Sequence, residues 1–253
     1  MAMQHLENEL RKTGDPRDLE RANTVASWLK ERGSDLPSQT AAVRSTIKTP
    51  VETKNIIGAQ SVFETPTVNE DLYLKTRESL AKEGYTFIVD IEPLSIGQLA
   101  TGQATRKSFG YVNPSENMRA IAPQQMEVAI NPNNLRIPNS NSKSTDTQIG
   151  MIQKEETALK GKLSQEVKDL INMRMQNASV LAQLDHKYQE ETGEVLFTDW
   201  FGRTDDQTIP GNVADVGRLD PTGGLDVVDC RRGRGPGYVF AVPVVVLPRK
   251  LAV

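Results

Sequence analysis

The sequence holds one candidate nucleophile, Cys230, and one neighbouring acid and base, Asp185 with His186. A nucleophilic triad needs a base that a third group orients. Adjacent helical residues point about 100° apart, so Asp185 cannot orient His186, which we expect on a solvated helix face. Arginines follow Cys230 and would lower its pKa, yet a lone cysteine at a strand end is typically an inert small residue. We therefore predict no catalytic residue and expect that the protein is not an enzyme.

Aspartates are concentrated near the end of the chain, at Asp215, Asp220, Asp226 and Asp229. A calcium loop places oxygen ligands at every second residue around a glycine, and this spacing is missing here. The better interpretation is solvated strand and loop positions. Neither a metal nor another cofactor is predicted.

A glycine-rich segment, residues 233–237, superficially resembles a phosphate-binding loop. Such a loop needs a helix directly after the glycines, whereas a valine-rich run follows here, and Pro236 removes one amide donor. Arg231, Arg232 and Arg234 could instead contact an anionic partner, or they could simply keep an exposed turn in water. Because the chain carries a net charge of -3, we expect nucleic acid to be an unlikely ligand.

The same part of the chain is depleted in long, flexible side chains. Lys, Glu, Gln, Met and Trp together make up about a quarter of residues 1–210. None of these five residue types occurs in residues 211–249. Glycine-rich turns and β-branched strands exclude such side chains, which is one sufficient explanation.

A second explanation comes from the polar residues set within this apolar frame, which are Asp215, Arg218, Asp226, Asp229, Arg231, Arg232, Arg234 and Tyr238. The frame ends in Ala-Val-Pro-Val-Val-Val-Leu-Pro at residues 241–248. This end resembles that of the variable proteins diversified by retroelements, whose C-type-lectin-like domains finish in a strand of the form G-[VF]-R-P-V-L-V-L. The chain has Val242 where that family usually has the arginine before proline, and it lacks the family's tryptophan-rich helix.

The resemblance implies that template adenines are mutagenised, so that asparagine codons become codons for many residue types but never for Lys, Glu, Gln, Met or Trp. It further implies that the eight polar residues form a ligand-binding face, and that the fold is C-type-lectin-like. The chain as a whole also resembles a group of proteins from small-genome uncultured bacteria, which implies no chemistry.

The elements that must position these residues follow from periodicity and turn chemistry. The 253 residues predict an α+β fold with a helical arm at 1–33, a Ser/Thr/Pro-rich linker at 34–66, and one domain at 67–253 whose variable β region is 211–250. Within the domain we expect a helix capped by Asn69, a strand at 85–92, extended segments at 108–112 and 126–130, and helices between 145 and 193 ending at Gly193. Valine-rich runs at 213–219, 225–230 and 238–247 predict a three-stranded antiparallel β-meander, with the last run buried beside 225–230 and interrupted by Pro243.

These features favour a non-enzymatic module that binds an unknown protein or surface ligand through its C-terminal face. The alternatives are a structural or assembly protein of phage origin, and an enzyme of unrecognised type. The longest apolar run, Tyr238 to Leu247, is about half of what a bilayer-spanning helix needs. No apolar stretch follows the first methionine, so the expected location is the cytoplasm, with export by another route left open.

Overall fold

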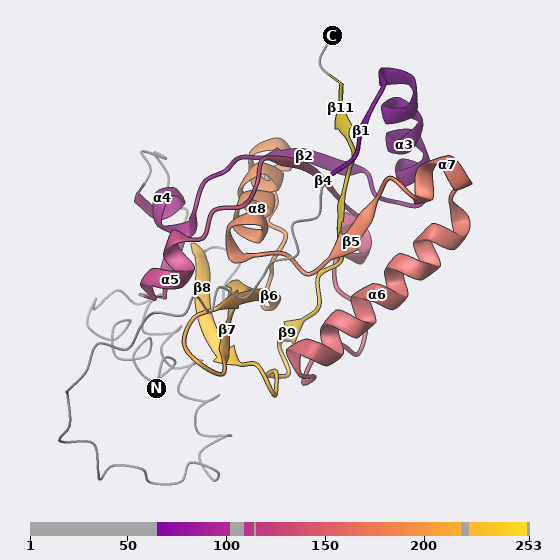
Figure 1. The fold of residues 1–253 in the computed structure, drawn as a ribbon. Coiled ribbons are helices and arrows are strands. Elements are labelled where there is room, and N and C mark those ends of the chain that lie inside the picture. Colours follow the sequence, from indigo (N-terminus) through magenta and orange to yellow (C-terminus); the bar gives the residue numbers. More distant parts are fainter. Residues whose placement is uncertain (1–64, 102–108, 114, 219–222, 252–253) are drawn as a thin grey trace, which may run out of the picture.

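The computed structural model describes residues 65–101, 109–113, 115–218 and 223–251, and Figure 1 shows their arrangement. The predicted arm at 1–33, and the predicted linker at 34–66 except for its last two residues, lie outside the described residues. The described elements, in chain order, are β1 (Thr67–Val68), α3 (Glu70–Lys82), β2 (Phe87–Ile91), α4 (Ile96–Thr101), β3 (Phe109–Val112), α5 (Glu116–Ala120), β4 (Met126–Ile130), a 3-10 turn (Pro132–Asn134), α6 (Thr145–Lys162), α7 (Gln165–Lys168), β5 (Asn172–Arg174), α8 (Ala178–Thr192), β6 (Phe201–Gln207), β7 (Asn212–Gly217), β8 (Leu225–Arg231), β9 (Val239–Phe240), β10 (Val244–Val246) and β11 (Arg249–Lys250).

The strands form three sheets, and the α+β prediction is confirmed. A four-stranded antiparallel sheet has the order β2-β4-β10-β5, and a five-stranded mixed sheet has the order β3-β8-β7-β6-β9. A parallel ribbon joins β1 to β11. Consecutive strands β6, β7 and β8 pair antiparallel, so the described chain does contain a three-stranded meander.

The observed and predicted meanders share β7 and β8, but the remaining strand is β6 in the structure instead of the predicted run at 238–247. The run at 238–247 is not one strand beside 225–230, because Pro243 lies where the chain leaves one sheet for another. Before it, β9 pairs in parallel with β6; after it, β10 pairs with β4 and β5. The run is apolar on both faces because β10 lies in the interior of the four-stranded sheet, where each face is covered.

Helix α8 occupies the space between the two larger sheets (Figure 1). Eight consecutive residues at its beginning, Ala178 to Asp185, are buried, as expected of a helix covered on all sides. Its apolar side chains share one core with residues of β2, β4, β7, β8 and β10. Asn177 caps the first turn through its side chain, and Gly193 ends the helix at φ 78°, as the sequence predicts.

A second core covers the other face of the four-stranded sheet. Val245 of β10 packs there with Leu80 of α3 and with Ile152 and Leu159 of α6. Its neighbours Val244 and Val246 face the α8 side, since successive side chains of a strand alternate between faces. The layers therefore run from α3 and α6, through the four-stranded sheet and α8, to the five-stranded sheet.

Candidate functional site

The structure separates the eight predicted binding residues into two groups. Asp215, Arg218 and Asp226 are buried, whereas Arg231, Arg232 and Arg234 are exposed, and Asp229 and Tyr238 lie between these extremes. The expectation that Asp215 and Asp226 occupy solvated positions is therefore wrong, and Arg218 is buried as well. Asp215 and Arg218 are each held in an ion pair inside the molecule, where water does not compete for it.

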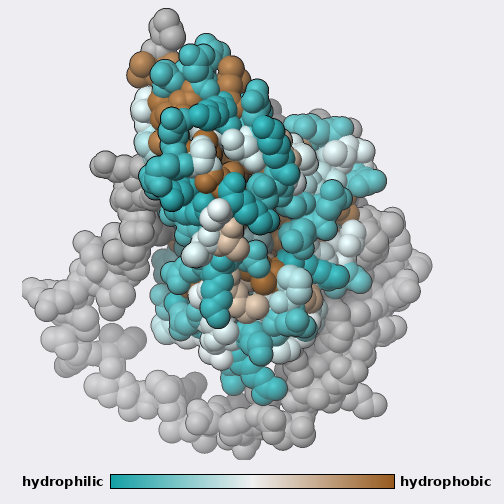
Figure 2. Space-filling model, turned by 90° about the vertical axis from the view of Figure 1, so that its right-hand side faces the viewer, coloured by the Kyte–Doolittle hydropathy of each residue, from teal (hydrophilic) through white to brown (hydrophobic). Residues whose placement is uncertain are grey.

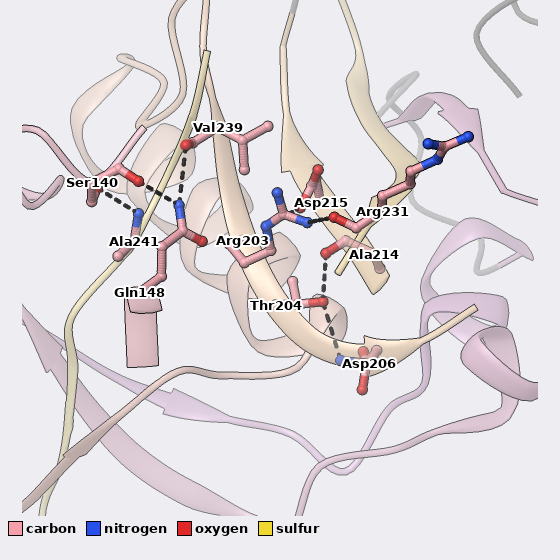
Figure 3. A network of polar contacts seen from close by, with 10 residues as sticks. All are labelled: Ser140, Gln148, Arg203, Thr204, Asp206, Ala214, Asp215, Arg231, Val239 and Ala241. Atoms are coloured by element: carbon pink, nitrogen blue, oxygen red, sulfur yellow. Dashed lines mark hydrogen bonds and ion pairs between the residues drawn. The ribbon is translucent and has the colours of Figure 1, made fainter. Parts of the chain in front are cut away.

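Asp215 of β7 pairs with Arg203 of β6, at 3.1 Å between Oδ1 and Nε, and both side chains are completely buried. Arg203 also donates from Nη1 to the carbonyl oxygen of Arg231, at 3.4 Å (Figure 3). Burial raises the pKa of Asp215 to about 6, although Arg203 and a hydrogen bond from Cys230 both act to lower it. The pair thus joins three adjacent strands beneath the exposed arginines.

Cys230 lies near this pair and is buried. Burial first, and the nearby Asp215 carboxylate second, raise the pKa of its thiol well above the ordinary value. Because the thiolate is the nucleophilic form, Cys230 is held in its unreactive state, and the arginines that follow it do not change that.

A second buried pair links α8 to the end of β7. Asp185 binds Arg218 and also accepts hydrogen bonds from the backbone N–H groups of Leu196 and Phe197, at 3.0 and 3.4 Å. His186 points elsewhere, and its ring meets that of Phe109 edge to face at 5.1 Å. It is half-buried, not on an open helix face as expected, because β3 covers this part of α8.

Sequence reasoning missed the polar strand β6, which supplies Arg203, Thr204 and Asp206 to the network in Figure 3. Its pairing with β7 shifts register between Arg203 and Gln207, and the hydroxyl of Thr204 donates to the carbonyl oxygen of Ala214 at 2.8 Å within this irregular stretch. Such irregularities redirect side chains and are common next to functional sites. A polar segment that precedes a valine-rich hairpin was the only sequence signal for this strand.

The irregularity places Asp206 under the beginning of α8. Its Oδ2 accepts a hydrogen bond from the backbone N–H of Ala178 at 2.7 Å. Burial first, and the adjacent Asp205 carboxylate second, raise the pKa of Asp206 to about 7. The pKa of Asp205 is also raised, mainly by burial.

The exposed arginines lie on a segment that we name the arginine turn, residues 231–237. Two other segments, one at Gly211 and one at residues 142–145, hold its backbone. Arg232 donates its N–H to Gly211 at 2.8 Å and accepts at its carbonyl from Thr145 at 2.9 Å. Gly235 donates to Lys143 at 2.8 Å, and Pro236 accepts from Ser142 at 3.1 Å.

Close packing beneath the turn explains one of its glycines, Gly235. A Cβ atom at Gly235 would lie 2.8 Å from the carbonyl oxygen of Lys143 and 2.8 Å from Nη2 of Arg203, so a larger residue does not fit. Next to the turn in the chain, Val239 is also held: Gln148 of α6 donates to the carbonyl oxygens of Ser140 and Val239, at 2.9 and 3.2 Å (Figure 3). The turn is therefore a rigid part of the fold.

The arrangement is suited to presenting charge. No group of three or more metal-ligating side chains occurs among residues 65–101, 109–113, 115–218 and 223–251. Within the same residues, no helix is both long and apolar enough to cross a membrane. Asp229 is engaged by the amides of Asn113 and Asn212, at 3.0 and 2.7 Å, so it serves the edge of the sheet.

Comparison with known proteins gives no relative for this site. No family model matches the chain, and no curated protein or solved structure matches it.

Proposed function

We propose that the protein is a non-enzymatic binding module whose contact surface is centred on the arginine turn. The observation that carries this proposal is that three exposed guanidinium groups stand on a backbone held by four hydrogen bonds to two other segments. A surface that is rigid before binding loses little conformational entropy on contact, and arginine is among the residues that dominate binding energy. Diversification is proposed only for the five positions that are exposed or half-buried, which we call the accessible positions: Asp229, Arg231, Arg232, Arg234 and Tyr238.

The buried residues Asp215, Arg218 and Asp226 then act as framework. The test is to sequence related copies of residues 211–249 within one genome, together with any neighbouring reverse transcriptase and template repeat. We expect substitutions at the five accessible positions and constancy at the three framework positions. Equal variation at both sets, or no variation at all, would contradict a diversified binding face.

A second candidate function, assembly, is supported by a different surface. Leu74 of α3 and Leu251, directly after β11, are exposed to 47% and 56%. Figure 2 shows hydrophobic atoms beside hydrophilic ones at the end of the molecule that carries α3. The ion pair of Lys250 with Glu70, one helical turn before Leu74, keeps these two elements together.

Light scattering over a range of protein concentrations distinguishes assembly from simple binding. An assembly protein should show a mass that grows with concentration and that falls when Leu74→Ser and Leu251→Ser are combined. Ile209→Ser, at another exposed apolar position, is the matched control. A monomer at every concentration would remove this candidate.

A further inference from the structure

We infer that the ligand of the arginine turn is an acidic protein segment, whose carboxylates are bound by Arg231 and Arg234 and for which Asp146 competes at Arg232. The inference rests on the proposed binding function and names the partner class. It begins from the balance of charge on this face. Arg231, Arg232, Arg234 and Lys143 are all exposed and lie on two segments joined by backbone hydrogen bonds.

The only acid on this face that forms an ion pair with these cations, within the described ranges, is Asp146, which binds Arg232 at 2.6 Å. Arg231, Arg234 and Lys143 form no ion pair with any described residue. Figure 3 shows the side chain of Arg231 pointing away from the buried network. The face therefore carries an excess of positive charge on a chain whose net charge is -3.

The chemistry of these cations favours carboxylates on a protein over a nucleic acid. A guanidinium group presents a planar fork of donors that matches a carboxylate or a phosphate. Binding to a nucleic acid, however, draws its affinity from many phosphate contacts, and binding to single strands adds stacking of bases on exposed aromatic rings. Here the unpaired cations are few, and the ring of Tyr238 is half-buried and packs edge to face against Phe201 at 5.7 Å.

Asp146 allows a second test, in which removing a charge should raise the affinity for the ligand instead of lowering it. It lies in the first turn of α6 and is itself exposed, so it occupies Arg232 in the way that a carboxylate of the ligand would. Removing its charge should release Arg232 for the ligand. The same face should therefore gain affinity from one substitution and lose it from others.

The experiment is fluorescence anisotropy with the full chain and a labelled peptide rich in glutamate, at low and moderate salt. The parent should bind, and more weakly as salt rises. Arg231→Gln combined with Arg234→Gln should weaken binding by about tenfold or more, whereas Asp146→Asn should strengthen it by roughly two- to fivefold. Arg234→Gln alone should give an intermediate loss.

Lys82→Gln combined with Lys154→Gln is the matched control, because it removes the same charge from exposed helical positions elsewhere. It should change affinity by less than about twofold. Equal losses in the arginine variant and this control, or no binding by the parent, would overturn the inference. Tighter binding of a single-stranded DNA of similar charge would show instead that the partner is a nucleic acid. In either case, substitutions confined to the accessible positions in related copies would leave the binding function standing.

Discussion

Asp215 and Arg203 are buried charges that depend on each other. We expect Asp215→Asn to lower the free energy of unfolding by about 3–5 kcal/mol, because it leaves the Arg203 guanidinium inside the protein without a counter-charge. Urea denaturation measures the loss, and Asp90→Asn, at an exposed position of β2, is the control. A loss below about 1 kcal/mol would mean that water reaches the pair.

Asp206 should make stability depend on pH. Its pKa in the folded protein is about 7, raised from an ordinary value of 3.8, so between these values the folded state binds more protons than the unfolded state. The free energy of unfolding must then fall as pH rises through this window. Asp206→Asn keeps an acceptor for the Ala178 N–H and removes the charge.

The variant should therefore lose less stability than the parent between pH 5 and pH 8, and it should be the more stable of the two at pH 8. Denaturation at both pH values measures this difference, with Asp90→Asn again as control. Some dependence should remain, since the pKa of Asp215 is also raised. If the free energy of unfolding changed equally with pH in parent and variant, Asp206 would be ionised in the folded protein without loss of stability.

At the scale of elements, strands β6 and β7 approach each other so closely that one position admits only glycine. A Cβ atom at Gly217 would lie 2.2 Å from the carbonyl oxygen of Trp200 and 2.6 Å from Cα of Phe201. Gly217→Ala should cost about 1–3 kcal/mol or more, because backbone atoms must move. Gly150→Ala, in the middle of α6 where nothing lies within 4 Å of an added Cβ atom, should instead raise the free energy of unfolding by about 0.5–1 kcal/mol. Thermal melts compare the two variants, and shifts of the same sign would contradict this account.

Strand β10 is the element on which both cores depend. Val245 is completely buried between β4 and β5, so Val245→Asp would place an unpaired charge in the second core. We expect this variant not to accumulate as folded protein. Leu251→Asp, at an exposed position, should fold and melt like the parent. A soluble Val245→Asp variant with an unchanged melting temperature would show that β10 is not in the interior.

Local signals in the sequence were enough for several elements. The cap residue Asn69, the apolar run at β2 and the termination at Gly193 each depend on neighbours in the chain, and the structure has α3, β2 and α8 at these places. Strands β5 and β6 were missed because Asn172–Arg174 is short and Phe201–Gln207 is polar. The charges of β6 can be buried only because distant strands and α8 supply partners, which no local pattern reveals.

The same limit applies to the candidate site. The sequence pointed correctly to an exposed arginine cluster, but it assigned Asp215 and Arg218 to the same surface. The alternation of side chains along β7 does not reveal that these two residues are buried, because their ion-pair partners, Arg203 and Asp185, come from other elements. The last apolar run was predicted beside the wrong strand for the same reason. Pro243 indicates that the strand is interrupted, but it does not indicate which sheet the chain joins next.

At the scale of the whole molecule, one short segment completes every sheet. Residues 239–250 add β9 to the five-stranded sheet, β10 to the four-stranded sheet and β11 to the ribbon with β1. The described layers are consequently closed by long-range pairings, a topology that slows folding.

This arrangement has a consequence for the protein during its synthesis. A ribosome makes β4 long before β10, and at about 5–20 residues per second the delay is on the order of ten seconds. During that time the edge of β4 that pairs with β10 in the finished protein lacks this partner strand, and its backbone N–H and C=O groups are left unpaired. We expect nascent chains stalled after Arg231 to be cleaved readily by protease and to bind chaperones, and chains released after Val253 to resist cleavage at β4. Equal protease resistance in both would mean that the sheets close without their last strands.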